Sequence, residues 1–336
     1  MLVLKEKKMD RRTAIKQSAL LALVAMVNTK VIYAMSETKQ EIRGYSRFKL
    51  GKLEITLVTD GHIPMTPVQP NFAPGIDAKK VNQALEAHFA SKKMVDLGIN
   101  IMLIKSGNRM IMIDSGCGSS FGANSGWLVP NLEKAGIKAS DITDVVISHA
   151  HPDHIGGLTN EAGKLVFPNA EIYLSQIEHD FWMADQQDFS KSKIKDEELK
   201  RMVVSVAKKN ITAAKSRLHL VGDGDELFCC IRVHLAPGHT PGHCILEVYT
   251  GGDRLFHLAD LVHSAALVIE HPEWGFEGDT DFELAITSRK KVLGQLAAEK
   301  SLLFSYHLPW PGLGHLKQKG QAYEWLPQQS ALPDLR

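Results

Sequence analysis

The sequence has almost no excess of charge of either sign. Lys and Arg together number 39 and Asp and Glu 38, so the formal net charge is +1 over 336 residues. No stripe of basic residues interleaved with aromatics occurs, and such a stripe is typical of proteins that bind nucleic acid. The composition therefore predicts no nucleic-acid partner and favours a small-molecule substrate.

Cysteines and long apolar runs are also few. The four cysteines, Cys117, Cys229, Cys230 and Cys244, do not have the spacing of a zinc knuckle. We favour packed thiols over a disulfide framework, although the sequence leaves their redox state open. The apolar stretch at 19–27 is too short to span a bilayer comfortably, so we expect no stable membrane span in the mature chain.

The N-terminal segment predicts export. Arg11 and Arg12 precede the apolar stretch, and the small Ala34 offers a cleavage point. We interpret residues 1–35 as a twin-arginine-like signal for a periplasmic or secreted protein. An uncleaved anchor or an amphipathic helix is the alternative. The remaining residues, 36–336, are expected to form a single catalytic domain.

The order of the expected elements predicts the fold class. Strands dominate residues 51–113 and 218–260, with helical patterns at 176–216 and 281–300 and a last strand at 301–307. Strands, then a helix, then strands and a helix again indicate an α+β protein with two halves. We expect the sheets to pack inside and the helices to lie outside.

The segment "SHAHPDH", residues 148–154, directly follows a β-branched apolar run. Imidazole nitrogens and carboxylate oxygens suit zinc and similar divalent ions. His149 and His151 lie two positions apart and can point the same way, while Asp153 and His154 can serve a second ion. Taken alone, the loop has too few ligands for two metals.

Further histidines and acids stand where later strands end. His239 lies in "PGHTPGH", Asp260 ends "RLFHLAD", and His307 ends "LLFSYH". In their order, these segments resemble the metal motifs of the metallo-β-lactamase superfamily, whose fold is an αββα sandwich. The resemblance runs from about residue 50 to 320.

The resemblance implies a dinuclear metal centre. His149, His151 and His239 would hold the first metal, and Asp153, His154 and His307 the second. Asp260 would bridge both metals, and a metal-bridging hydroxide oriented by Asp153 and Asp260 would be the nucleophile. Asp114, in "IMIDSG", matches an acid that orients a ligand histidine from behind.

Two departures within the superfamily narrow the chemistry. A carboxylate, Asp260, stands where many antibiotic-cleaving members have cysteine, and His151 stands where diiron members usually have glutamate. Hydrolysis is therefore favoured over redox chemistry. The segment around residues 113–158 and the ending "HLPWPGLGHL" are similar to the methyl parathion hydrolase and lactonase-like group.

This resemblance implies activity on a lactone or ester, above all on N-acyl homoserine lactones. A phosphotriesterase or arylesterase is the alternative, and a metal-binding or sensing protein without turnover ranks lower. A nuclease of the superfamily would need a basic groove. Two zinc ions are the expected cofactors, although manganese, cobalt or iron also fit such ligands, and a homodimer is possible.

Aromatic side chains on expected loops are candidates for the substrate pocket. We choose Phe121 and Trp182 first, ahead of Phe72 and Phe181. The alternative, core aromatics beneath long loops, is about equally favoured for each. His243 is expected to support the site from behind, and the histidines outside the motifs, His263 among them, to be structural or exposed.

Overall fold

The computed structural model of the chain describes residues 44–328. The export signal predicted for residues 1–35 lies outside this part and stays a prediction. All four cysteines lie inside it as free thiols, of which Cys117, Cys230 and Cys244 are buried and Cys229 is exposed.

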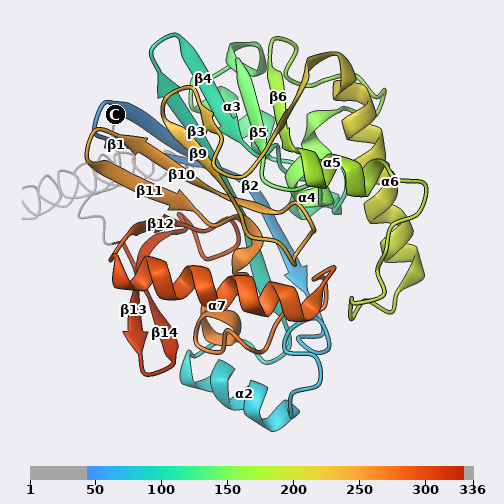
Figure 1. Cartoon of the computed structure of the whole chain (residues 1–336), viewed down its shortest axis with the longest axis vertical. Coiled ribbons are helices and arrows are strands. Elements are labelled where there is room, and N and C mark those ends of the chain that lie inside the picture. Colours follow the sequence, from blue (N-terminus) through green and yellow to red (C-terminus); the bar gives the residue numbers. More distant parts are fainter. Residues whose placement is uncertain (1–43, 329–336) are drawn as a thin grey trace, which may run out of the picture. The chain divides into compact units, whose positions relative to one another are not determined.

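Two seven-stranded sheets form the centre of the fold (Figure 1). The first sheet runs in sequence order through β1 (Tyr45–Leu50), β2 (Leu53–Met65), β3 (Val95–Ser106), β4 (Arg109–Ile113), β5 (Asp144–Ile147), β6 (Glu171–Ser175) and β7 (Leu218–Val221). The second sheet contains β8 (Glu226–Leu227), β9 (Ile231–Leu235), β10 (Cys244–Thr250), β11 (Asp253–His257), β12 (Leu302–Phe304), β13 (Leu313–Lys319) and β14 (Ala322–Pro327).

Both sheets are mixed. In the first, β1 to β4 pair antiparallel, whereas β4 to β7 pair parallel. In the second, only β11 and β12 pair parallel. The parallel strand β5 is buried along its whole length, as expected for a strand covered on both faces.

Apolar side chains from both sheets form one buried cluster. Leu57 and Ile113 of the first sheet belong to it together with Val233 and Leu246 of the second, and all four are fully buried. A second cluster includes side chains of the strands and of the covering helices, such as Leu132 and Leu293. Burial of apolar surface on both faces of the sheets is the main stabilising contribution to this arrangement.

The longer helices lie outside the two sheets, whereas the short α4 directly follows the loop after β5 and is buried (Figure 1). The helices are α2 (Ala78–Ala87), α3 (Leu128–Lys134), α4 (Pro152–Ile155), α5 (Gln176–Met183), α6 (Glu197–Ala214) and α7 (Phe282–Ala298). Side-chain oxygens of Asp77, Ser175, Asp196 and Asp281 accept hydrogen bonds from the first backbone N–H groups of α2, α5, α6 and α7, which fixes where these helices begin.

The α+β fold class and the αββα layering are therefore confirmed. Two details differ from expectation. The first strand, β1, begins at Tyr45, before the expected strands, and pairs with β2 at the edge of its sheet. The strand near residue 304 is not the last one, because the polar segments β13 and β14 add a hairpin at the sheet edge.

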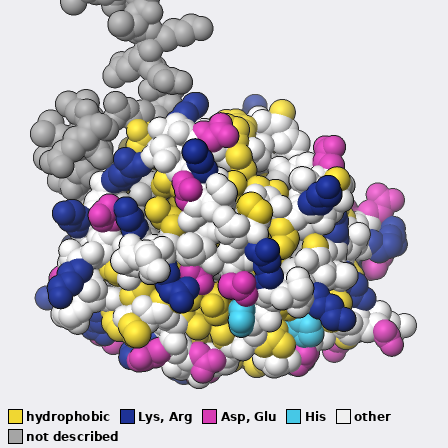
Figure 2. Space-filling model, turned by 90° about the horizontal axis from the view of Figure 1, so that it is seen from above, with side chains coloured by type: hydrophobic (Ala, Val, Ile, Leu, Met, Phe, Trp, Pro, Cys, Tyr) yellow, Lys and Arg dark blue, Asp and Glu magenta, His cyan; other side chains and the backbone are white. Residues whose placement is uncertain are grey.

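Within residues 44–328, no helix is both long enough and apolar enough to cross a membrane. Figure 2 shows one face of the molecule, on which Lys and Arg side chains are interspersed with Asp and Glu. This mixture agrees with the near-zero net charge.

Candidate metal centre

Segments that follow the ends of four strands bring the predicted ligands together. The loop after β5 carries His149 and His151 and continues into α4, which holds Asp153 and His154. His239 follows β9, Asp260 lies in the short helix η5 (Ala259–Leu261) after β11, and His307 follows β12. Parallel pairing of β11 with β12 places the last two segments side by side.

The side chains form two groups that share one residue. His149, His151, His239 and Asp260 make the first group, and Asp153, His154, Asp260 and His307 the second, with the ligand atoms of each group within 4.8 Å of one another. These are the two sets that the sequence predicted, and Asp260 belongs to both.

The two carboxylate oxygens of Asp260 face different groups. Oδ2 lies 3.1 Å from Nε2 of His239 and 3.7 Å from Nε2 of His149, whereas Oδ1 lies 2.8 Å from Nε2 of His154. Nε2 of His307 lies between them, 3.2 Å from Oδ1 and 3.3 Å from Oδ2. One carboxylate can therefore bind two cations, one on each oxygen.

The donor set fits two divalent ions. Nε2 of His149 is buried, and no described residue forms a hydrogen bond with it. Leaving buried polar atoms without a partner is costly unless something else binds them. Burial would raise the pKa of Asp260, but the surrounding histidines hold it well below its usual range, so the carboxylate is ionised.

Asp114 supports the second group. Its Oδ2 lies 2.9 Å from Nδ1 of His154, and its two oxygens also accept hydrogen bonds from the backbone N–H and hydroxyl of Ser148. Burial lowers the pKa of His154, but the carboxylates of Asp260, Asp153 and Asp114 outweigh burial and raise it well above its usual value. The orienting contact predicted for Asp114 is present.

Other ligand histidines also have a polar partner at the ring nitrogen that does not face the centre. His239 Nδ1 lies 2.9 Å from Oδ1 of the buried Asp279, and His307 Nδ1 donates to the carbonyl of Gly98 over 2.9 Å. His243 donates from Nδ1 to the carbonyl of Ala236 and accepts at Nε2 from the backbone N–H of Asp260. His243 thus contacts the backbone of Asp260 rather than joining either group of ligands.

Glu178, on α5, joins the two ligand loops of the first group. Its carboxylate accepts hydrogen bonds from the backbone N–H of Ala150 and Gly242 and from the hydroxyl of Thr240. It also accepts one from the indole N–H of Trp182, over 2.6 Å. Burial raises its pKa despite these four donors.

The pocket role predicted for Trp182 is wrong. Its side chain is fully buried, and its ring packs edge-on against His151 with ring centroids 5.8 Å apart. Phe72 is also fully buried. These rings face inward because α5 and the loop near residue 72 pack against the main core cluster. Phe121 and Phe181 are partly buried, and their pocket role stays a prediction.

Sequence reasoning missed several residues around the centre. Asp279 and Glu178 are isolated acids without a motif. His263 Nε2 lies 3.1 Å from Oδ2 of Asp260, and the ring of Phe276 stacks on His263 at 4.3 Å and on His239 at 6.2 Å. Of these residues, only His263 had a sequence signal: it follows Asp260 by three residues, which could have indicated that the two side chains lie close together.

Comparison with known proteins agrees with this geometry. Residues 94–307, more than half of the chain, match the family described as the Metallo-beta-lactamase superfamily. The solved structure of AidC, described as a dizinc quorum-quenching lactonase in complex with the product N-hexanoyl-L-homoserine, is 40% identical, and the alignment covers 86% of this chain and 99% of that chain with a TM-score of 0.82.

Two further relatives are informative. The structure of AbOPH, a hydrolase in the beta lactamase superfamily, is 30% identical and aligns over 87% of this chain and 100% of that chain with a TM-score of 0.79. An N-acyl homoserine lactonase of Bacillus cereus is 26% identical over 183 residues, 54% of this chain and 61% of the length of that protein. The chain thus belongs to the metallo-beta-lactamase superfamily.

Proposed function

We propose that this protein is a dinuclear zinc hydrolase that opens the lactone ring of N-acyl homoserine lactones. The observation that carries the proposal is the pair of ligand groups that share Asp260. The similarity to the dizinc lactonase AidC supports zinc and a lactone substrate. The lactonase of Bacillus cereus supports the same acyl homoserine class.

Zinc ions bound by the two groups would lower the pKa of water and polarise the lactone carbonyl. The protein's own residues arrange this chemistry. Asp260 spaces the two groups by offering one oxygen to each. Asp153, whose side chain is 13% exposed, is more accessible than Asp260, which is 3% exposed. We therefore assign to Asp153 the orientation of the attacking water.

An apolar wall beside the first group suits an acyl chain. Phe276 is partly buried and stacks on His263 and His239. Its ring also lies 5.2 Å from that of Phe72, centroid to centroid. A substrate that reaches His239 would contact this ring, and apolar contact of this kind favours a hydrocarbon tail.

Comparative turnover tests the proposal. Zinc-loaded protein should open N-hexanoyl homoserine lactone faster than it cleaves a nitrophenyl phosphotriester or nitrophenyl acetate, relative to each uncatalysed rate. A reversed order would assign phosphotriesterase or arylesterase activity instead. No turnover of any substrate with both metals bound would indicate a binding or sensing protein.

Export is a separate proposal and rests on the sequence alone. The twin arginines and the apolar stretch after them support transport of the folded, metal-loaded protein. Cell fractionation should find the protein outside the cytoplasm, and replacing Arg11 and Arg12 with Lys should retain it inside. The homodimer also stays a prediction, which sedimentation velocity tests.

A further inference from the structure

A buried ion pair lies behind the first group of ligands. Asp279 is fully buried, and Arg289, on α7, is 1% exposed. Nη2 of Arg289 lies 3.4 Å from Oδ2 of Asp279, whose other oxygen lies 2.9 Å from Nδ1 of His239. A continuous chain of polar contacts therefore runs from α7 to a ligand histidine.

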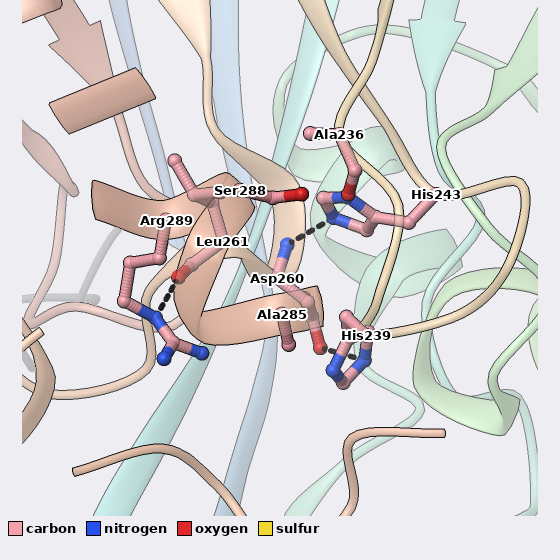
Figure 3. A pocket seen from close by; sticks show the side chains of 8 residues that line it. All are labelled: Ala236, His239, His243, Asp260, Leu261, Ala285, Ser288 and Arg289. Carbon is pink, nitrogen blue, oxygen red and sulfur yellow. Dashed lines mark hydrogen bonds and ion pairs between the residues drawn. The ribbon is translucent and has the colours of Figure 1, made fainter. Parts of the chain in front are cut away.

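The same guanidinium also holds the segment that carries Asp260. Nε of Arg289 donates to the carbonyl of Leu261 over 2.8 Å, and Nη1 donates to the carbonyl of Pro272 over 3.2 Å. Leu261 directly follows Asp260 in the short helix η5. Figure 3 shows Arg289 reaching the Leu261 carbonyl on one side of Asp260, with His239 and His243 on the other side.

Stability alone is a poor explanation for this arrangement. A buried ion pair loses about as much free energy on desolvation as it gains, and apolar side chains of similar volume are often as stable. What the guanidinium provides is a rigid, planar set of donors that point in fixed directions, which a lysine cannot reproduce. Here those donors reach Asp279, whose carboxylate contacts His239, and the Leu261 carbonyl, which directly follows Asp260.

We infer that Arg289 and Asp279 are positioning residues for the first metal, whereas Asp114 positions the second. The inference rests on the dinuclear centre of the proposed function. Asp279 orients His239, and Arg289 fixes both Asp279 and the backbone next to Asp260. Asp114 contacts His154 of the second group directly and reaches His149 of the first group only through the Ser148 hydroxyl, which lies 3.2 Å from Nδ1 of His149. His239 and His154 thus have separate supports, and no sequence motif marks the one behind His239.

Zinc affinity in a background with one metal tests this division. The H307A variant removes a ligand of the second group only and should keep one tightly bound zinc ion. Adding D279N or R289K should lower the affinity for that ion by about 10- to 100-fold, which is the usual effect of losing a residue that orients a ligand. Adding D114N should lower the affinity less, because Asp114 reaches this group only through the Ser148 hydroxyl. Titration against a chromophoric chelator measures each value.

Thr287 provides a matched control, because it lies on α7 close to Arg289 and its exposed hydroxyl donates only to the carbonyl of Glu283 in the same helix. T287A should keep the affinity of its background. Circular dichroism checks the fold of every variant. If D279N does not fold, the zinc affinity of R289K, which keeps the positive charge, tests the inference. Wild-type affinity in R289K, or equal weakening by D114N, would overturn the inference.

The outcome is independent of the substrate. If the wild-type protein binds two zinc ions but opens no lactone, the proposed function fails, and the division of supports can still hold. If lactone opening is confirmed but D279N and R289K bind zinc as tightly as their background, the inference fails alone.

Discussion

The ring of Tyr306 stacks on the imidazole of His154, with centroids 4.0 Å apart and an interplanar angle of 25°. The Tyr306 hydroxyl donates to the backbone carbonyl of Asp153 over 2.7 Å. One buried tyrosine from the segment after β12 thus holds two successive ligands of the second group.

Replacing this tyrosine with phenylalanine separates the two contacts. Y306F keeps the stacked ring but leaves the buried Asp153 carbonyl without its donor, so we expect a loss of about 1–3 kcal/mol in the free energy of unfolding. Urea denaturation measures it. Y45F, at a partly buried tyrosine whose hydroxyl forms no hydrogen bond with a described residue, is the control and should change little. Equal effects of the two variants would contradict the account.

Glu178 offers a second stability test. Its four donors surround an acceptor-only carboxylate, so the NH2 group of a glutamine would face N–H and O–H donors. We expect E178Q to lose about 2–4 kcal/mol of unfolding free energy. E171Q, at an exposed glutamate on β6, should lose much less. Wild-type stability of E178Q in thermal and urea unfolding would disprove this role.

The pH dependence of stability tests the environment of Asp60. Its carboxylate accepts from the backbone N–H groups of Cys117, Gly126 and Leu128. Burial nevertheless raises its pKa from 3.8 to about 6. The folded protein therefore keeps this proton more tightly than the unfolded chain does, and the stability linked to it is fully present below pH 4 and is lost as pH rises to about 6.

The D60N variant lacks this titration and should be less stable at every pH, because an amide offers one acceptor oxygen rather than two. The difference in the free energy of unfolding between the wild-type protein and D60N should shrink by up to about 3 kcal/mol between pH 4 and pH 7. Urea denaturation of both proteins across this range measures the difference. A constant difference, or one that grows with pH, would show that the pKa of Asp60 is not raised.

Phe276 tests the proposed acyl wall. F276A should raise KM for N-decanoyl homoserine lactone more than for N-butanoyl homoserine lactone and should change kcat less, because the ring contacts the tail and not the reacting bond. Kinetics over a series of chain lengths measures this split. The control F48A removes a partly buried phenylalanine of β1 that packs on the cluster between the sheets, and it should not change the dependence on chain length. A change independent of chain length would place the acyl tail elsewhere.

The ligands of the metal centre were predictable where they lie close together in the sequence or within an ordered motif. His149, His151, Asp153 and His154 lie within six consecutive positions, and their residue types alone indicate a metal site. His239, Asp260 and His307 are each single residues, but they stand at strand ends within ordered motifs. The fold class followed from the same alternation of strands and helices.

The supporting residues could not be predicted, because their contacts depend on tertiary packing. Asp279 lies 40 positions from His239 in the sequence, and Glu178 lies 62 positions from Thr240. Trp182 was expected on a loop at a pocket mouth, but it lies on the inward face of α5 and is fully buried. The strands β13 and β14 are partly exposed and polar, so they lack the apolar run that marks β5.

The proposed function requires two zinc ions, held by groups that share Asp260, to open a homoserine lactone. Zinc content and ring opening are to be measured together for the wild-type protein and D260A, with zinc determined by mass spectrometry and the acid product by liquid chromatography. We expect two zinc ions per wild-type chain with lactone turnover, and loss of both ions and of turnover in D260A. Wild-type protein with two bound zinc ions and no lactone turnover, or D260A that keeps both ions, would contradict it.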